Sequence, residues 1–164
     1  METERLLLRQ FREQDLDAYA ALLADAELMR YFNDGLATRE QAWRHMAMHD
    51  GHWMLLGYGR WAVELKATGR MIGRVGMWCP EGWPEIELGW LLARDHWGYG
   101  YATEAAREGL RHTFGALALS HAISLIHPDN ARSIRVAERL GGTLEQTIFF
   151  HGHDTLVYGY NAPP

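Results

Sequence analysis

The sequence predicts one α/β (α+β) domain in which helices cover a mixed β-sheet, and three observations lead to this prediction. The chain has 164 residues, which is the size of a single domain. Its hydrophobic pattern changes from helical spacing near the start to strand-like runs in the middle. The predicted elements follow the order strand, two helices, three strands, helix, strand, helix, two strands. We therefore treat residues 1–164 as one domain.

The first third of the chain is predicted to form one strand and two helices. The strand is RLLLRQF, residues 5–11, whose leucines point to alternating faces. Residues 12–32 have apolar side chains at helical spacing, and Asp15 is the candidate N-terminal cap of this helix. Residues 38–53 form the second predicted helix, with Thr38 as its candidate cap.

The rest of the chain is predicted to alternate between strands and helices. Two strands, residues 58–66 and 71–78, form a hairpin around a turn that contains glycine. The remaining predicted elements are a strand at 86–92, a helix at 101–117, a strand at 121–127, a helix at 130–142 and two strands within 143–160, separated by an HGHD turn at 151–154.

Composition excludes several classes of protein. The formal charge is −5 without a Lys/Arg cluster, which argues against a nucleic-acid binder. Cys79 is the single cysteine, so an intramolecular disulfide or a multi-cysteine zinc site is impossible. No apolar run approaches the roughly 20 residues that span a bilayer, and the N-terminal residues lack the zones of a signal peptide. We expect a cytoplasmic protein without a membrane partner.

The stretch HWGYGYATEA places two glycines, Gly98 and Gly100, between a predicted strand and a predicted helix. Glycine permits a tight turn at such a junction. Glycines at a helix N-terminus also let a phosphate approach several backbone N–H groups. Both interpretations are compatible with the local sequence.

The wider sequence resembles the GNAT acetyltransferase superfamily. HWGYGYATEA, followed by HPDNARSIRVAERLGG, is similar to its acyl-CoA-binding core, and the opening ERLLLRQFREQDLDAYAALL is similar to the branch of ribosomal-protein alanine N-acetyltransferases. The resemblance implies the GNAT fold, a mixed and mostly antiparallel sheet of six to seven strands with about four helices. It also implies acetyl-CoA as cofactor. Relatives often form homodimers, and the last two strands offer an edge for pairing.

The resemblance implies a set of cofactor-binding residues around the glycine turn. The family pattern of Gln or Arg, two residues, Gly, one residue, then Gly or Ala falls on Trp97, Gly100 and Ala102, and Trp97 departs from it. The backbone N–H groups of this turn would bind the pyrophosphate, with Arg94 and His96 as candidate sources of positive charge. The expected cofactor-binding residues are Leu91, Trp97, Gly98, Tyr99, Gly100, Tyr101, Ala102, Thr103, Asn130 and Ser133.

Acetyl transfer to an amine requires a base, a donor to the thioester carbonyl and a proton for the thiolate. The resemblance implies Glu87 as the general base, acting through a water, with Glu85 and Glu64 as competitors. The alternative for Glu87 is an exposed strand carboxylate without a catalytic role. The donor is expected among the backbone N–H groups near Gly89 to Leu91, where Gly89 is consistent with a bulge. Ser133 is the expected proton donor or orienting group near the sulfur.

Asn130 and Ser133 match the family motif at the start of a helix. Asn130 is expected to hydrogen-bond the cofactor arm, and it is also a candidate helix cap. Ser133 has the alternative of being a plain hydroxyl in the first helical turn. The resemblance therefore implies a catalytic pair, Glu87 and Ser133.

Two further groups of side chains have competing interpretations. His45, His49 and His52 have a spacing that suits metal ligands, but a polar pocket wall or plain surface is favoured and no metal is expected. Five tryptophans either line an acceptor pocket or fill the core; they are Trp43, Trp53, Trp78, Trp83 and Trp90. Residues 31–58 are where the acceptor site varies in the family. Cys79 has no evident base partner.

The function predicted from these observations is direct transfer of an acetyl group from acetyl-CoA to a primary amine. The acceptor is either a small molecule or the N-terminus of a peptide or protein. The alternative is a non-catalytic module that binds or senses acyl-CoA. A dinucleotide-binding fold is rejected, because Thr103 stands where its motif requires a third glycine.

Overall fold

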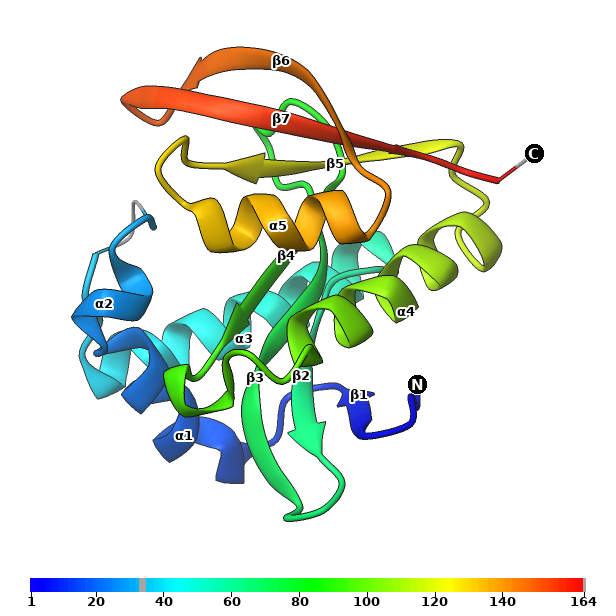
Figure 1. Cartoon of the computed structure of the whole chain (residues 1–164). Helices are drawn as coiled ribbons and strands as arrows, with labels where there is room; N and C mark the ends of the chain where they lie inside the picture. The colour runs from blue at the N-terminus through cyan, green and yellow to red at the C-terminus, as the bar shows by residue number, and fades with distance from the viewer. Residues whose placement is uncertain (33–34, 164) are drawn as a thin grey trace.

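The computed structural model describes residues 1–32 and 35–163 of the chain (Figure 1). Its helical elements are η1 (Glu13–Asp15), α1 (Leu16–Leu23), α2 (Ala26–Met29), α3 (Arg39–Leu56), η2 (Arg94–His96), α4 (Tyr101–Gly115) and α5 (Ala131–Arg139). Its strands are β1 (Leu6–Arg9), β2 (Arg60–Leu65), β3 (Arg70–Trp78), β4 (Glu87–Leu92), β5 (His121–Ile126), β6 (Thr143–Phe150) and β7 (His153–Asn161). No helix in this described part is long and apolar enough to cross a membrane.

The seven strands form one mixed sheet, which confirms the predicted fold class. Their order is β1-β2-β3-β4-β5-β7-β6, and β4 and β5 are the parallel pair in an otherwise antiparallel sheet. Helices α4 and α5 cover one face, whereas α1 and α3 cover the other (Figure 1). Alternate strand residues fill two separate cores: Leu88 packs with Ala106 of α4, and Leu91 packs in the cluster that holds Tyr19 of α1.

The sheet opens between β4 and β5. One register pair, Glu87 with Ile123, joins these two strands. The Ser124 hydroxyl also donates to the Leu88 carbonyl over 2.6 Å, at the point where the strands separate. Beyond Leu88 β4 stays paired with β3, while its other edge has no neighbouring strand among the described residues.

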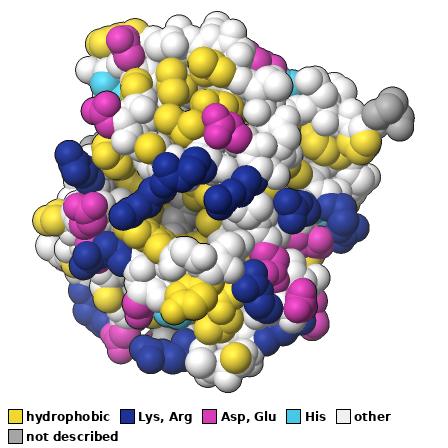
Figure 2. Space-filling model, in the orientation of Figure 1, with side chains coloured by type: hydrophobic (Ala, Val, Ile, Leu, Met, Phe, Trp, Pro, Cys, Tyr) yellow, Lys and Arg dark blue, Asp and Glu magenta, His cyan; other side chains and the backbone are white. Residues whose placement is uncertain are grey.

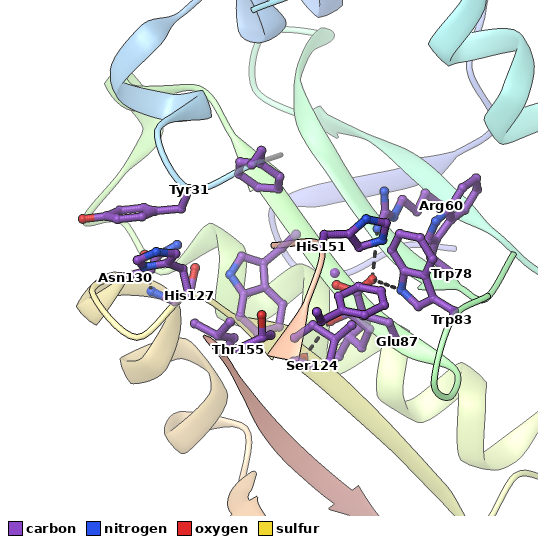
Figure 3. Close-up of a pocket in the computed structure, with 18 of the residues that line it drawn as sticks. Tyr31, Arg60, Trp78, Trp83, Glu87, Ser124, His127, Asn130, His151 and Thr155 are labelled. Atoms are coloured by element: carbon purple, nitrogen blue, oxygen red, sulfur yellow. Dashed lines mark hydrogen bonds and ion pairs between the residues drawn. The ribbon is translucent and has the colours of Figure 1, made fainter. Parts of the chain in front are cut away.

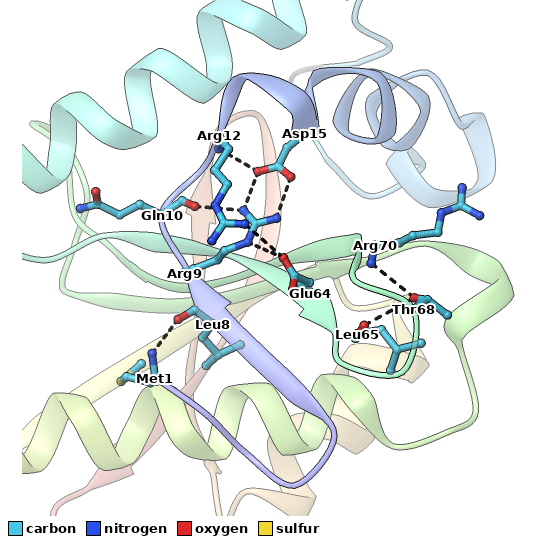
Figure 4. A network of polar contacts seen from close by, with 10 residues as sticks. All are labelled: Met1, Leu8, Arg9, Gln10, Arg12, Asp15, Glu64, Leu65, Thr68 and Arg70. Carbon is cyan, nitrogen blue, oxygen red and sulfur yellow. Dashed lines mark hydrogen bonds and ion pairs between the residues drawn. The ribbon is translucent and has the colours of Figure 1, made fainter.

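The single helix expected over residues 12–32 is divided into η1, α1 and α2, so that prediction is wrong in detail. Helix α1 ends at Leu23, and Asp25 caps α2 by accepting hydrogen bonds from two backbone N–H groups. The expected cap Asp15 accepts no hydrogen bond from the first turn of α1. Its carboxylate instead receives both terminal nitrogens of Arg9, at 2.6 and 2.8 Å, and the backbone N–H of Arg12 (Figure 4).

Arg9 lies at the centre of a buried ionic network. Its Nε donates to Glu64 on β2 over 2.7 Å, while Asp15 binds the other end of the guanidinium (Figure 4). Hydrogen bonds from Arg9 to the two carboxylates and the attraction of their charges outweigh desolvation and raise the pKa of Arg9. The network fixes η1 against the outer strands β1 and β2.

The remaining local predictions are largely confirmed. Thr38 accepts from the backbone N–H of Gln41 and caps α3, which continues to Leu56 rather than ending at residue 53. The expected HGHD turn joins β6 to β7, and His151 and Gly152 both have positive φ there.

Gly89 does not form the expected bulge, because β3 and β4 pair in continuous register through Gly76 and Gly89. A Cβ on Gly89 would lie 3.2 Å from Arg60 Nη2. Its lack of a side chain therefore makes room for this guanidinium.

Candidate functional site

Two cavities adjoin at the opening between β4 and β5. The larger, about 820 Å³, lies along the glycine turn and α5; the smaller, about 400 Å³, lies over β3, β4 and the ends of β6 and β7. Five residues line both cavities: Tyr31, Phe32, Trp90, Asn130 and Ser133. A group at this junction can therefore contact ligands in both cavities. We call the larger cavity the cleft and the smaller one the pocket.

The glycine turn leaves the N-terminus of α4 open to the cleft. Gly98 and Gly100 have φ of +83° and +82°, the left-handed region that favours glycine. A Cβ on Gly98 would meet nothing within 4 Å, and one on Gly100 would meet Arg5 at 3.6 Å. No side chain caps α4. Its first backbone N–H groups, with the helix dipole, thus remain available to an anion.

Arg5 supports this turn from behind. Its guanidinium pairs with Glu104 at 2.6 Å, donates to the Tyr99 carbonyl over 2.9 Å and lies 4.5 Å from the centre of the Tyr101 ring. These contacts connect β1 to the start of α4. They fix a turn in which two glycines would otherwise allow the backbone more than one conformation.

Trp97, which departs from the family pattern, has a structural place at the turn. Its indole N–H donates to the Leu92 carbonyl over 2.7 Å. The Arg132 guanidinium lies over its ring, 4.2 Å from the centre. Trp97 thereby connects β4 to α5 at the edge of the cleft.

Most of the expected cofactor-binding residues line the cleft: Leu91, Trp97, Gly98, Gly100, Tyr101, Ala102, Thr103, Asn130 and Ser133. Tyr99 is not among the lining residues, and its side chain is exposed. The expected helper Arg94 is directed elsewhere, because it pairs with Asp25 at 2.6 Å. His96 does line the cleft.

Sequence reasoning missed three arginines of α5, Arg132, Arg135 and Arg139, which are exposed and line the cleft. They occur at i, i+3 and i+7, the spacing of one helical face, so the sequence held the signal. Figure 2 shows basic side chains gathered around a hollow on the face where α5 lies. A cleft with this charge suits a ligand with several phosphates.

The free edge of β4 presents backbone groups to the cavities. The carbonyls of Ile86, Leu88 and Leu92 point toward β5 or the cleft, since they accept from Ile123, Ser124 and Trp97 respectively.

Backbone groups alternate along a strand, so the N–H of Trp90 faces the same way. The N–H of Leu91 lies on the opposite edge, where Leu91 pairs with Arg74 of β3. Of the backbone donors expected between Gly89 and Leu91, Trp90 is the one that faces the cavities.

Glu87 is a largely buried carboxylate that lines the pocket. Its Oε2 accepts from the indole N–H of Trp83 over 2.9 Å and lies 3.4 Å from Arg60 Nη2 (Figure 3). Its Oε1 makes no hydrogen bond or ion pair with the described residues. The carboxylate is thus held by one oxygen and open at the other.

The two competing carboxylates are placed differently. Glu85 lies outside the pocket lining and pairs with His121. Glu64 binds Arg9 in the network at the outer strands. Neither lines the pocket or the cleft among the described residues.

Asn130 and Ser133 begin α5 at the junction of the two cavities. The Asn130 Oδ1 accepts from the Ser133 backbone N–H over 3.2 Å, so Asn130 is the N-cap, as the sequence indicated. The cap leaves the Asn130 side-chain NH₂ and the Ser133 hydroxyl without hydrogen bonds to the described residues. Both groups are available to a ligand.

The tryptophans divide between the pocket and the rest of the molecule. Trp78, Trp83 and Trp90 line the pocket. Trp53 packs against Trp61 in the core, and Trp43 is exposed on α3. The expected acceptor region, residues 31–58, contributes to the pocket, but positions 33–34 within it lie outside the described residues.

The three histidines of α3 form an aromatic layer. His45 lines the pocket and lies 2.7 Å from the Tyr19 hydroxyl, while His49 and His52 are buried against Trp78. Burial and the nearby charges of Arg74 and Arg60 hold the pKa of His49 well below its usual value. In the described chain no cluster of three or more His, Cys, Asp and Glu is arranged to hold a metal.

Cys79 follows β3, and its backbone N–H faces His52 Nε2 at 3.3 Å. Burial, together with the charges of Glu85 and Glu87, raises the pKa of the thiol. A raised pKa opposes formation of a reactive thiolate.

Comparison with known proteins identifies the family. Residues 5–143 match the model of the acetyltransferase (GNAT) domain. The chain is 34% identical over 150 residues to the uncharacterized protein YkkB of Bacillus subtilis (strain 168), covering 89% of this chain and 86% of the relative.

Solved structures give the same result. An acetyltransferase from Agrobacterium tumefaciens is 34% identical and superposes with a TM-score of 0.88, covering 99% of this chain and 94% of the other. Spermidine N-acetyltransferase from Vibrio cholerae, in complex with CoA and spermine, shares the fold with 20% identity and a TM-score of 0.78 over 97% of this chain and 96% of the other. The chain belongs to the GNAT family of acetyltransferases.

Proposed function

We propose that this protein transfers the acetyl group of acetyl-CoA to a primary amine by direct attack within a ternary complex. The observation that carries the proposal is the junction of the two cavities. The cleft offers a glycine turn and basic side chains, the pocket offers the Glu87 carboxylate, and Trp90, Asn130 and Ser133 line both. A thioester at the junction and an amine in the pocket would be adjacent there.

The backbone and the charged side chains that line the cleft suit coenzyme A. The turn has no side chain at positions 98 and 100, and no described side chain caps α4. Arg132, Arg135 and Arg139 add positive charge. These groups would hold the phosphates, while the open edge of β4 and the Asn130 side chain would bind the cofactor arm. Acetyl-CoA supplies an activated acyl group as a thioester.

The residues of the chain would then divide the chemistry. Glu87 accepts a proton from the ammonium form of the acceptor, directly or through a water, which frees the nitrogen lone pair. The backbone N–H of Trp90 donates to the carbonyl oxygen as negative charge develops on it. As the C–N bond forms and the C–S bond breaks, the Ser133 hydroxyl gives a proton to the sulfur. The nitrogen loses its second proton as it becomes an amide, and this proton returns to the Ser133 oxygen, directly or through a water. Glu87 returns its proton to solvent after product release.

The first test of the proposed function measures acetyl-CoA binding and acetyl transfer on the same proteins. Acetyl-CoA and CoA are titrated calorimetrically into the wild type and into Gly100→Trp, whose bulky side chain would disturb the glycine turn that lines the cleft. Gly69→Trp is the matched control, because Gly69 has a similar positive φ, +66°, in the β2–β3 turn away from the cleft. We expect binding to the wild type and the control, and none to Gly100→Trp. Absence of binding to the wild type would overturn the cofactor assignment.

Transfer is measured on the same proteins as release of free CoA thiol in the presence of primary amines. We expect release with at least one amine, and mass spectrometry should find the product heavier by one acetyl group. Binding of acetyl-CoA without transfer to any amine would instead support the non-catalytic acyl-CoA-binding alternative.

A further inference from the structure

Arg74 is a buried arginine in the wall of the pocket. It lies in the middle of β3, in register with Ala62 of β2 and Leu91 of β4, and is 2% exposed. It shares the α3-facing side of the sheet with Trp78, since the two residues are four positions apart on the strand. Arg74 and Glu87 both line the pocket.

The guanidinium of Arg74 has no anionic partner among the described residues. Within residues 1–32 and 35–163 it makes no hydrogen bond or ion pair, and its Nε is buried without an acceptor. The Phe32 ring, 5.9 Å from its Cζ, is its cation–π neighbour. The other buried arginine networks are different, because Arg9 has two carboxylates and Arg60 has Glu87. A buried charge without a counter-ion is costly, so this position calls for an anion.

The surroundings of Arg74 do not supply that anion. The described side chains that line the pocket include two arginines, Arg60 and Arg74, but only one carboxylate, Glu87. Burial and the charge of Arg74 hold the pKa of His49 well below its usual value, and an imidazole carries no negative charge in either form, so His49 cannot act as a counter-ion. The pocket therefore carries an excess of positive charge, which repels a ligand with several ammonium groups and attracts one that carries an acid.

We propose that the acceptor is a primary amine that also carries a carboxylate, and that Arg74 binds this carboxylate while the amine faces Glu87. This inference rests on the proposed transfer to an amine and adds the class of acceptor. The planar guanidinium can bind a carboxylate with two parallel hydrogen bonds, which fixes the orientation of a small molecule. The aromatic walls formed by Trp78, Trp83 and Trp90 suit an apolar remainder.

The test measures binding rather than turnover. Amino acids with one to five carbon atoms between amine and carboxylate are titrated calorimetrically into the protein, with and without saturating CoA. Each is compared with its own carboxamide, which keeps the amine and the shape but lacks the charge. We expect at least one acid to bind roughly tenfold or more tightly than its carboxamide. Spermidine should bind more weakly than that acid.

Variants of two β3 residues test whether Arg74 causes the preference for an acid over its carboxamide. Arg74→Met should reduce the ratio of acid to carboxamide affinity to about one, and Arg74→Lys should retain part of it. Arg70→Met, an exposed position on the same strand, should leave the ratio unchanged. Circular dichroism confirms that each variant is folded, and the wild-type comparison of acid with carboxamide needs no variant.

The inference would be overturned if no acid bound more tightly than its carboxamide, or if the preference survived in Arg74→Met. Its failure is distinct from that of the proposed function. Loss of acetyl-CoA binding would contradict the transfer reaction alone, because the titrations without CoA would still report on Arg74. Intact acetyl-CoA binding without preference for an acid would contradict this inference alone.

Discussion

The indole N–H of Trp83 donates a 2.9 Å hydrogen bond to Oε2 of Glu87, although Trp83 lies in the loop before the strand that carries Glu87. Arg60 contacts the same oxygen. Both contacts leave Oε1 as the oxygen without a partner among the described residues, and this is the atom that we expect to receive the proton. The loop between β3 and β4 therefore orients the proposed base through one carboxylate oxygen and leaves the other oxygen available to accept a proton.

Replacing Glu87 by Gln should lower kcat by about 100-fold to 10,000-fold, because an amide cannot accept the proton of the acceptor. Acetyl-CoA affinity should stay within about twofold of wild type, since Glu87 lines the pocket rather than the cleft. The measurement is thiol release with an amine that the wild type acetylates. Glu85→Gln is the control and should retain full activity. An unchanged kcat in Glu87→Gln would assign the base to another group.

Asn130 has two proposed roles that different substitutions separate. Asn130→Ala removes the N-cap and should lower the free energy of unfolding by about 1 kcal/mol. Asn130→Asp retains a capping oxygen but adds a negative charge beside the cleft, so it should stay stable and bind acetyl-CoA less tightly. Urea denaturation and calorimetric titration measure the two effects. Wild-type acetyl-CoA affinity in both variants would limit Asn130 to the cap.

Arg9 should be among the most sensitive positions for stability. Arg9→Met leaves Asp15 and Glu64, whose side chains are 3% and 15% exposed, without their shared cation. Breaking a buried pair in this way costs about 3–5 kcal/mol. Arg12→Met is the control: Arg12 is half exposed and 3.7 Å from Glu64, so the loss should be under about 1 kcal/mol. Equal losses for the two variants in urea denaturation would contradict a central role for Arg9.

His49 should make stability depend on pH. Its folded-state pKa lies well below the value of about 6.5 expected in the unfolded chain, so between these values the unfolded chain binds the extra proton. The free energy of unfolding should therefore be constant above about pH 7 and decrease as the pH falls below 6.5.

His49→Phe, which retains the contacts with Phe11 and Trp78, should flatten this decrease in urea titrations between pH 5 and 8. The slope should not vanish, because burial also lowers the pKa of His52. Parallel profiles for the variant and the wild type would assign the pH dependence to other groups.

The sequence predicted those parts of the molecule that depend on neighbours in the chain. Period-two and helical patterns located all seven strands, and Thr38 and Asn130 were found as caps because a capping side chain bonds the turn that follows it. The glycine turn was found because positive φ has a residue signature, and both glycines adopt it.

Features that depend on distant partners were predicted less well. Asp15 stands where a helix cap is expected, but its carboxylate oxygens accept hydrogen bonds from Arg9 and from the backbone N–H of Arg12 instead. Gly89 suggested a bulge, whereas its actual constraint is the Arg60 guanidinium on another strand. The burial of Arg74 had no sequence signal at all, since an arginine in a strand is ordinarily solvated.

The opening between β4 and β5 divides the sheet into two parts. One register pair, at Glu87 and Ile123, connects the four-stranded part β1–β4 with the three-stranded part β5, β7 and β6. We expect amide hydrogen exchange in β4 and β5 to slow when a ligand binds in the cleft and connects the two parts. Residues of β4 and of α5 both line the cleft, so a ligand bound there would bridge the two parts of the sheet and hold them at a fixed separation.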